Sequence, residues 1–570
     1  MKSKSFFLGL AIASMPIAVK SQNFEWAKRI GGLNFDHGTS VTTDVSGNVY
    51  TTGYFVGTVD FDPGPGIFNL NSSGEADIFI SKLDANGNFM WAKQMGGISR
   101  NESLSITTDN TGNVFITGLF VGTADFDPGP GTYNLTSPGS EYHDAFICKL
   151  NSNGNFIWAK QMGGTYYDVG VSIMTDALGN VYTTGYFTGT VDFDPGPGVF
   201  TLNAAGGSLD WDVFISKLDI SGNFLWAKQL GGISYNSSTS VATDAFGNVY
   251  TTGRFEGTVD FDPGFGTFEL TSTGIDDVFI SKLDESGNFL WAKTIGGEEN
   301  DSGLCITTDD SGNVYTIGNF RSTADFDPGP GVFNLSTVLP GYDDIFISKL
   351  DASGNFLWAK QIGGEGFDWG RSIATDNLGN VYVTGYFSGT ADFDPGMEVY
   401  NLNSVGGADI FIAKLDASGS FLWAIQMGGT GFDESHSITT DASGNLYTTG
   451  SFYGTVDFNP GGWIFDLTSA GQTDIFIHKI TQPVSNIKAN NLVSTYQIFP
   501  NPTDGWLNID LGENTLNARV VVRNTLGQEI LRRDYYSTNQ IKLVLETNPG
   551  IYFLEITVNN QKEVIKIVKQ

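Results

Sequence analysis

Short runs of β-branched and aromatic residues, each bounded by Gly, Asn or Asp, alternate along most of this chain. One stretch reads FMWAKQMGG, SLSITTD, NVFITGLF, a long excursion containing ADFDPGPG, and DAFICKL. Runs of this length without a helical period indicate β-strands. The pattern predicts four strands per unit, a (SITTD), b (NVYTTG), c (DIFISKL) and d (NFLWAKQ), with the excursion between b and c.

This strand pattern repeats with a nearly constant period. The segment WAK, or WAI in the last copy, recurs at spacings of 65, 67, 68, 65, 67 and 65 residues, beginning at Trp26, Trp91, Trp158, Trp226, Trp291, Trp358 and Trp423. A fixed period of this size means that each unit buries its apolar face against its neighbours. Seven units of four antiparallel strands predict an all-β fold, a seven-bladed β-propeller.

The two ends of the repeat region complement each other. The chain begins its repeats with a lone d strand, residues 24–30, and the seventh unit stops after its c strand, residues 474–480. The N-terminal strand can therefore supply the missing d strand of the last blade and close the ring without a covalent hairpin. We expect the propeller to span residues 22–480.

The turns are as regular as the strands. A DxxGN turn follows strand a in every unit, and a similar turn leads into strand d. With Asp first and Gly fourth, both predict hairpins built from a type I turn plus a bulge. The a–b and c–d hairpins must then emerge on one face, and the longer b–c and d–a links on the other, where binding sites are favoured.

Units that read GGxxxD, SITTDxxGNVYTTG and DIFISKLDxxGNFLWAK resemble the bacterial SBBP-type β-propeller repeats. The resemblance covers about residues 24–480. It implies the propeller fold and leaves the function open, because such propellers serve many roles.

The segments outside the repeats predict export. Lys2 and Lys4 precede an apolar run at 6–19, which is typical of a secretory signal peptide, residues 1–21. That run is too short for a spanning helix, and no later run approaches the ~20 apolar residues that a span requires. Residues 481–495 read as a polar linker, and residues 496–570 contain alternating strands that predict a small β-sandwich.

The C-terminal module carries a recognisable set of residues: Pro500, Asn501, Pro502, Gly505, Gly550, Tyr552, Lys566 and Lys569. With these it resembles the type A C-terminal sorting domain of the type IX secretion system of Bacteroidetes. The resemblance implies passage through the periplasm, recognition of residues 496–570 by the outer-membrane secretion machinery, and then release or attachment to surface lipopolysaccharide. We expect a secreted or cell-surface protein.

Charge narrows the choice of partners. Of 30 Lys and Arg, 8 lie in residues 496–570, 3 in the signal peptide and one is Lys488, which leaves 18 against 54 acidic residues in residues 22–487. Thirteen of those 18 are lysines repeated on strands c and d, so only five arginines lie elsewhere. Nucleic acid and anionic membranes are therefore poor partners, whereas cations and cationic surfaces are plausible.

We expect a monomer. The two cysteines, Cys148 and Cys305, occupy non-equivalent positions, so we expect no disulfide.

Two repeated acidic patterns are candidate sites. Four residues after each GG pair the d–a loop carries Asp or Asn, often preceded by an aromatic, which would give a collar for cations or sugars or simply cap a turn: Asp36, Asn101, Asp168, Asn236, Asp301, Asp368 and Asp433, with Phe35, Tyr167, Tyr235, Phe367 and Phe432. The b–c excursion carries a DFD pair whose carboxylates could converge on calcium or form an ordinary Pro-Gly turn: Asp60 and Asp62, Asp125 and Asp127, Asp192 and Asp194, Asp260 and Asp262, Asp325 and Asp327, Asp392 and Asp394, and Asp457 with Asn459.

Catalytic signals are sparse. The four histidines form no nucleophile or zinc motif, although His37 and His436 would become neighbours on ring closure. The unrepeated acids Glu298, Glu299, Glu365 and Glu434 could supply a carboxylate pair for glycoside chemistry. We expect a binding or scaffold protein for a glycan or an extracellular protein, without a cofactor. The alternatives are a propeller hydrolase or lyase acting on polysaccharide, whose residues should break the sevenfold symmetry, and a passive calcium-stabilised surface component.

Overall fold

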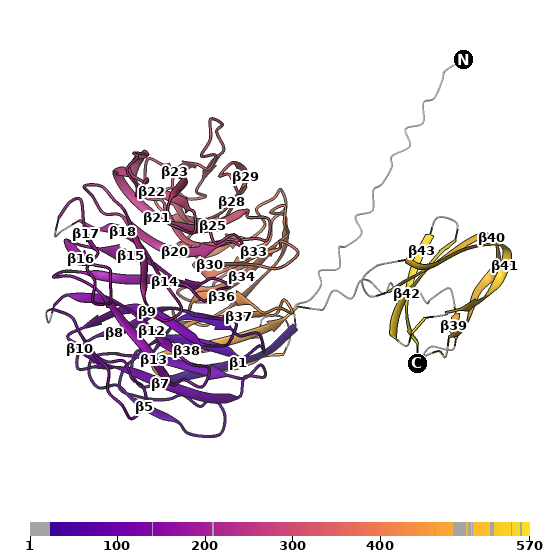
Figure 1. The fold of residues 1–570 in the computed structure, drawn as a ribbon, viewed down its shortest axis with the longest axis horizontal. Coiled ribbons are helices and arrows are strands. Elements are labelled where there is room, and N and C mark those ends of the chain that lie inside the picture. Colours follow the sequence, from indigo (N-terminus) through magenta and orange to yellow (C-terminus); the bar gives the residue numbers. More distant parts are fainter. Residues whose placement is uncertain are drawn as a thin grey trace, which may run out of the picture. The chain divides into compact units, whose positions relative to one another are not determined.

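The computed structural model describes residues 23–138, 141–207, 210–459, 461, 463–482, 497–499, 503, 505–524, 529–545, 547–548, 550–558 and 561–569. The predicted signal peptide, most of the predicted linker and the Pro500–Pro502 segment lie outside these residues. The chain divides into two compact units, residues 1–483 and 484–570, and both are built from β-strands (Figure 1).

Strand pairing within the first unit gives seven antiparallel four-stranded sheets in the predicted order a–b–c–d. Numbered as blades one to seven, they are β2 (His37–Thr43), β3 (Val49–Phe55), β6 (Asp77–Leu83) and β7 (Phe89–Gly97); β8 (Asn101–Thr108), β9 (Val114–Val121), β12 (His143–Leu150) and β13 (Phe156–Met162); β14 (Asp168–Thr175), β15 (Val181–Phe187), β18 (Asp212–Leu218) and β19 (Phe224–Leu230); β20 (Ser237–Thr243), β21 (Val249–Asp260), β22 (Glu269–Leu283) and β23 (Phe289–Gly297); β24 (Ser302–Thr308), β25 (Val314–Arg321), β28 (Asp343–Leu350) and β29 (Phe356–Gly364); β30 (Asp368–Thr375), β31 (Val381–Phe387), β34 (Asp409–Leu415) and β35 (Phe421–Met427); and β36 (Glu434–Thr440), β37 (Leu446–Asp457), β38 (Asp466–Thr481) and β1 (Asn23–Gly32).

The first strands of the blades form a closed circle. In order, β2, β8, β14, β20, β24, β30 and β36 each contact the next, and β36 contacts β2. A serine hydroxyl on one first strand accepts a backbone N–H from the neighbouring one, as from Ile106 to Ser40 (3.3 Å) and, across the closure, from Val41 to Ser437 (3.2 Å). The predicted all-β propeller is confirmed.

Each apolar core lies between two blades. Tyr50 and Ile80 of blade one pack in one buried cluster with Ile116 and Phe146 of blade two, and none of these four side chains is exposed. Burying an aliphatic or aromatic side chain of this kind contributes about 1.5–3 kcal/mol. A single unit cannot realise that gain alone, which is the physical reason for the repetition.

Blade seven is assembled from both ends of the repeat region, as predicted. Strand β1 pairs antiparallel with β38, with Phe24 opposite Ile480 and Ile30 opposite Ile475. In Figure 1 the indigo strand β1 lies beside the orange strands β37 and β38. The last two residues of β1, Gly31 and Gly32, pair onward with the excursion of blade one, so this strand holds two blades together.

The predicted hairpins are present. In the first, Asp44 Oδ1 accepts the N–H groups of Ser46 (2.9 Å) and Asn48 (3.0 Å), and Gly47 adopts the left-handed conformation that the bulge requires (φ 76°). The strand c lysines tie each blade to the next: Lys82 Nζ lies 4.7 Å from the centre of the Tyr50 ring and donates to the Ser152 carbonyl of blade two (3.2 Å). The repeated positive charge is therefore architectural.

The short strands of the excursions complete the first unit. They are continuations of the long strands in blades four and seven; in the other blades they are separate: β4 (Thr58–Asp60), β5 (Asn69–Asn71), β10 (Thr123–Asp125), β11 (Asn134–Thr136), β16 (Thr190–Asp192), β17 (Thr201–Asn203), β26 (Thr323–Asp325), β27 (Asn334–Ser336), β32 (Thr390–Asp392) and β33 (Asn401–Asn403).

The C-terminal unit is an antiparallel sheet with its own core. Its strands are β39 (Gln497–Phe499), β40 (Trp506–Asn524), β41 (Glu529–Val544), β42 (Gly550–Val558) and β43 (Gln561–Lys569). Strand β40 is longer than the sequence suggested, because the WLNIDL and ARVVVRN runs form one strand with a register shift between Asp510 and Thr515 where it pairs with β41. Leu507, Val520 and Leu554 are buried in the same apolar cluster.

Candidate functional site

The DFD segments join neighbouring blades. The first Asp of each pairs through its backbone with the first Gly of the GG sequence in the preceding blade, as Asp60 does with Gly31. Its carboxylate caps the excursion: Asp60 Oδ1 accepts the N–H groups of Asp62 (3.1 Å) and Phe68 (2.8 Å). The second Asp accepts from its own turn, with Gly64 N–H 2.8 Å from Asp62 Oδ1. The two carboxylates of a pair therefore have separate backbone partners.

Calcium binding by these pairs stays a prediction. Among the described residues no group of three or more His, Cys, Asp or Glu side chains is arranged to hold a metal ion. The same description applies to all seven copies, except that Asn459 donates its Nδ2 to the Trp463 carbonyl (2.6 Å). Any calcium bound here would have to draw on backbone oxygens or water as well.

Substitution of a DFD carboxylate separates capping from metal binding. We expect Asp260→Ala to cost about 1–2 kcal/mol of stability, because two backbone N–H groups lose their acceptor, and Asp260→Asn to cost much less. Thermal melting of both variants and the parent, with calcium and with a chelator, measures this. A chelator-induced drop in the parent that is weaker in Asp260→Asn would assign calcium to the pair instead.

The Asp and Asn residues of the predicted d–a collar point into the protein. All seven are buried: Asp36, Asn101, Asp168, Asn236, Asp301, Asp368 and Asp433. Asp168, for example, accepts the N–H groups of Gly164 (2.7 Å) and Thr188 (3.2 Å) and so holds the d–a and b–c links together. The part of the collar that faces solvent is its aromatics, of which Phe35, Tyr167, Tyr235, Phe367 and Phe432 are exposed.

Each of the five Asp residues of the collar lies near a second buried carboxyl. The partner is the Asp that begins strand c of the preceding blade, such as Asp144 for Asp168. Burial raises the pKa of Asp168 to about 8 and that of Asp144 to about 7, and the charge of Asp144 adds to the rise at Asp168. The strand c Asp also explains the first glycine of each GG pair, since a Cβ at Gly163 would lie 2.1 Å from Asp144 Cγ.

The centre of the ring contains a cavity of about 530 Å³ lined by the first strands of all seven blades. It brings together His37 and His436, as predicted from ring closure, and Glu434, one of the unrepeated acids. Glu434 Oε2 lies 3.9 Å from Arg371 Nη2 and 3.7 Å from His436 Nε2. Burial is the main cause that lowers the pKa of His436 to about 3, so this histidine is neutral at physiological pH.

A second cavity of about 510 Å³ adjoins the first on the loop face and shares Val171, Thr239 and Leu304 with it. Its wall carries aromatic rings and two arginines, with Asp343 beside them. Trp211 stacks on Tyr186 with ring centres 4.4 Å apart, and Tyr235 of the collar meets the edge of Trp211 at 5.4 Å.

Arginine and tryptophan side chains complete this wall. Arg254, Arg321 and Trp369 line the cavity. Arg321 Nε is 2.7 Å from Asp343 Oδ1, and Arg254 Nη1 is 3.4 Å from Asp276 Oδ2. Arg371, from the adjoining cavity, lies over the Trp369 ring at 4.9 Å. Three of the five non-repeated arginines thus gather round one opening of an otherwise acidic domain.

These cavity residues occupy repeat positions that differ from blade to blade. Trp211 stands where blades one and six have Ala76 and Ala408, and Arg254 stands where blade two has Leu119 and blade seven Ser451. Reasoning from the shared motifs missed them, because that reasoning followed what the copies have in common. Comparison of the seven copies with each other, column by column, would have found them.

Of the sorting residues, Gly505, Tyr552 and Lys569 lie near the end of the C-terminal unit where β42 begins and β43 ends. Gly505 N–H donates to Thr503 Oγ1 (3.0 Å), Lys569 Nζ donates to the Leu545 carbonyl (2.7 Å), and Tyr552 Oη donates to the Asn548 carbonyl (2.8 Å). No helix in the described residues is long and apolar enough to span a membrane.

Curated relatives share much of the chain without defining its role. An uncharacterized WD repeat-containing protein of Acanthamoeba polyphaga mimivirus is 26% identical over 512 residues, which cover 75% of this chain and 36% of that protein. The regulatory protein FlaEY of Caulobacter vibrioides is 22% identical over 435 residues, or 71% of this chain and 42% of that protein. The matches thus span well under half the length of either relative.

Among solved structures, a protein of unknown function from Bacteroides thetaiotaomicron matches with a TM-score of 0.28 and 10% identity, over 80% of this chain and 98% of that chain. This likeness is too weak to support any argument.

Family models match both units. The beta-propeller repeat SBBP matches residues 157–189, 225–254 and 357–391, and the secretion system C-terminal sorting domain matches residues 497–570. The predicted resemblances are confirmed. The chain is a protein of SBBP-type β-propeller repeats with a C-terminal sorting domain, exported by type IX secretion to the cell surface or the extracellular space.

Proposed function

We propose that the propeller is a surface-exposed or released binding module that takes an acidic glycan into the loop-face cavity at the centre of the ring. The observation that supports this most directly is the concentration of non-repeated residues there. In a domain whose copies are otherwise uniform, Trp211, Arg254 and Trp369 break the symmetry around one opening. A single binding site needs unique geometry, which uniform repeats cannot supply.

The chemistry of the wall favours a glycan with carboxylate or sulfate groups. Aromatic rings offer flat apolar faces for the C–H groups of a sugar ring. Arg254 keeps a side chain that is 43% exposed, so part of its guanidinium is free for a carboxylate or sulfate oxygen. An extracellular protein is the alternative ligand. The other alternative is an enzymatic role for His37, His436 and Glu434, which line the first central cavity, and an assay for turnover of surface polysaccharide tests it.

Substitutions that copy other blades test the site without threatening the fold. We expect Trp211→Ala, as in blades one and six, and Arg254→Ser, as in blade seven, each to weaken glycan binding at least about tenfold, because each removes a central contact. A glycan array followed by titration calorimetry at low and moderate salt measures this. The matched control is Phe265→Ala, which removes a fully exposed aromatic from an excursion outside the cavity.

The binding proposal fails if the parent protein binds no acidic glycan. It also fails if the two cavity variants bind an acidic glycan with the affinity of the parent. Loss of affinity at moderate salt is expected in addition, since exposed guanidinium contacts are screened.

A further inference from the structure

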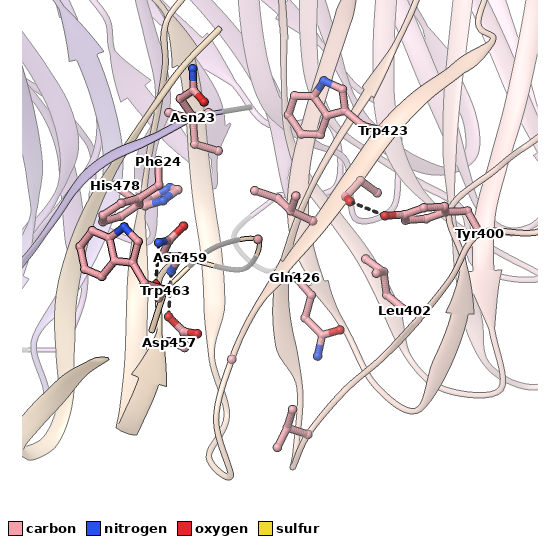
Figure 2. A pocket seen from close by; sticks show the side chains of 16 residues that line it. Asn23, Phe24, Tyr400, Leu402, Trp423, Gln426, Asp457, Asn459, Trp463 and His478 are labelled. Carbon is pink, nitrogen blue, oxygen red and sulfur yellow. Dashed lines mark hydrogen bonds between the residues drawn. The ribbon is translucent and has the colours of Figure 1, made fainter. Parts of the chain in front are cut away.

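A larger cavity of about 740 Å³ lies at the junction of blades six and seven, away from the centre of the ring, and shares no lining residue with the two central cavities. We refer to it as the seam pocket, lined by Phe24, Trp423, Asn459, Trp463 and His478 among others. Figure 2 shows Phe24, Trp463 and His478 on one wall, facing Trp423 and Tyr400 on the other.

The seam pocket is the larger counterpart of a cavity of about 370 Å³ between blades one and two, and it differs from that cavity because blade seven has no c–d hairpin. In five blades the d-strand Trp Nε1 donates to a carbonyl in the c–d turn of the next blade, as Trp358 does to Ala417 (3.4 Å). Trp423 has no such turn as a partner. In blade seven strands c and d are β38 and β1, which come from opposite ends of the repeat region, so no turn connects Thr481 to Asn23. Lys414 accordingly donates to the side chain of Gln482 (3.2 Å), where lysines of other blades reach a turn carbonyl.

The repeat pattern is broken on both walls of this pocket. Ile425 replaces the lysine of WAK, which removes the only cation of that strand. Trp463 stands where five excursions have Gly, and its indole is 67% exposed. His478 stands where four blades have Ser on strand c. Three independent departures from the repeat therefore meet at one junction.

His478 is a buried polar group whose ring has no hydrogen bond of normal geometry in the described residues. The residue is 1% exposed, and neither Nδ1 nor Nε2 has such a partner. Its ring stacks on Phe24 with centres 5.7 Å apart. The backbone of Phe458 interacts with the ring and leaves one imidazole nitrogen to be partnered. A buried nitrogen without a partner costs about 1–3 kcal/mol, which a ligand hydroxyl in the pocket would recover.

The charges of the pocket point to a neutral ligand. Its one charged lining residue is Asp457, whose Oδ1 already accepts the N–H groups of Asn459 and Phe465 (both 2.9 Å). The pocket combines aromatic faces with an imidazole and side-chain amides. These groups suit a ligand ring that is apolar on its faces and rich in hydroxyls at its edges. The volume lies within the ordinary range for small-ligand pockets, about 300–1,000 Å³.

We propose that the seam pocket is a second site, which binds a neutral saccharide with a sugar ring packed against Trp463 and Phe24 and a hydroxyl bonded to His478. This inference goes beyond the proposed central site and uses different residues. It also gives a role to the aromatic side chains that the closing strand β1 and the last excursion bring together.

The mature full-length protein can be tested with cellotriose, maltotriose and mannotriose as neutral probes, by saturation-transfer NMR and tryptophan fluorescence. We expect at least one to bind, and Trp463→Gly and His478→Ser each to weaken it at least about tenfold. Both changes restore residues found in other blades, so thermal melting should show an intact fold. Phe265→Ala and the central variant Trp211→Ala should leave this binding unchanged.

Absence of binding by all three sugars, or unchanged binding in Trp463→Gly, would overturn the proposal. Binding of an apolar dye at Trp463 that no sugar displaces would also overturn the proposal, since that result indicates an apolar ligand for the pocket. Loss of acidic-glycan binding in Trp211→Ala with neutral-sugar binding retained keeps the two sites distinguishable.

Discussion

Deletion of residues 23–32 is expected to abolish the cooperative thermal unfolding of the propeller. Strand β1 gives seven residue pairs to β38 and two more to the excursion of blade one. Its Ile30 is fully buried in a cluster with Val41 of blade one and Ile477 of blade seven. Loss of the strand would expose that cluster and leave an unpaired sheet edge on β38, which favours aggregation.

Two controls separate ring closure from a general effect of shortening the chain. A variant lacking residues 484–570 should melt as the parent does, because those residues belong to a different compact unit. A variant that carries residues 24–32 behind Ile480, joined through a copy of the DASGS turn at 416–420, should recover the transition. Differential scanning calorimetry of the three variants decides the matter, and parental melting of the deletion variant would show that β1 is dispensable.

The fold could be predicted from the sequence because its determinants are local and repeated. The Asp44 turn, its glycine and the flanking alternation specify one hairpin, and seven copies specify the ring. Closure by β1 was predictable as well, since the unpaired strand at 24–30 matches the incomplete last unit. The length of β40 was not, because the turn-like GENT sequence between its two halves is spanned by extended backbone.

The sites were harder to predict because they depend on contacts that the repeat pattern does not contain. Carboxylates spaced two apart, as in Asp60 and Asp62, suggested convergence, yet backbone N–H groups of the same loop engage each one separately. The seam pocket joins Phe24 to Trp423 and His478, which are about four hundred residues and more away in sequence. Only the register of β1 on β38 brings them together.

Replacement of paired buried carboxyls should stabilise the propeller at alkaline pH. Burial raises the pKa of Asp168 and Asp368 to about 8, and the nearby charges of Asp144 and Asp344 add to the rise. In the unfolded chain the pKa of these two carboxyls is near 3.8. Between about pH 4 and pH 8 the unfolded chain has therefore lost protons that the folded protein still holds. The unfolding free energy must therefore fall as pH rises from about 4 to about 8 and level off above that range.

The chain itself supplies the replacement. Blades two and four carry Asn101 and Asn236 at this position, and Asn236 Nδ2 donates to the Ser234 carbonyl (2.9 Å) while its Oδ1 still accepts the Glu256 N–H (3.3 Å). We expect Asp168→Asn to gain about 2 kcal/mol at pH 8 and almost nothing near pH 4, because the amide never ionises. Urea denaturation across this pH range measures the difference.

The reverse substitution, Asn236→Asp, should introduce the same penalty. It places a second carboxyl beside the buried Asp212, so stability should fall at pH 8 and change little near pH 4.

Below about pH 4 the stability of both variants and of the parent should fall together. Turn carboxylates such as Asp44 have pKa values lowered by hydrogen bonds from Asn48, Tyr50 and Ser46, so protonation removes the stability they contribute. A parent whose stability rises between pH 5 and pH 8 would contradict the assignment of protons to the buried pairs.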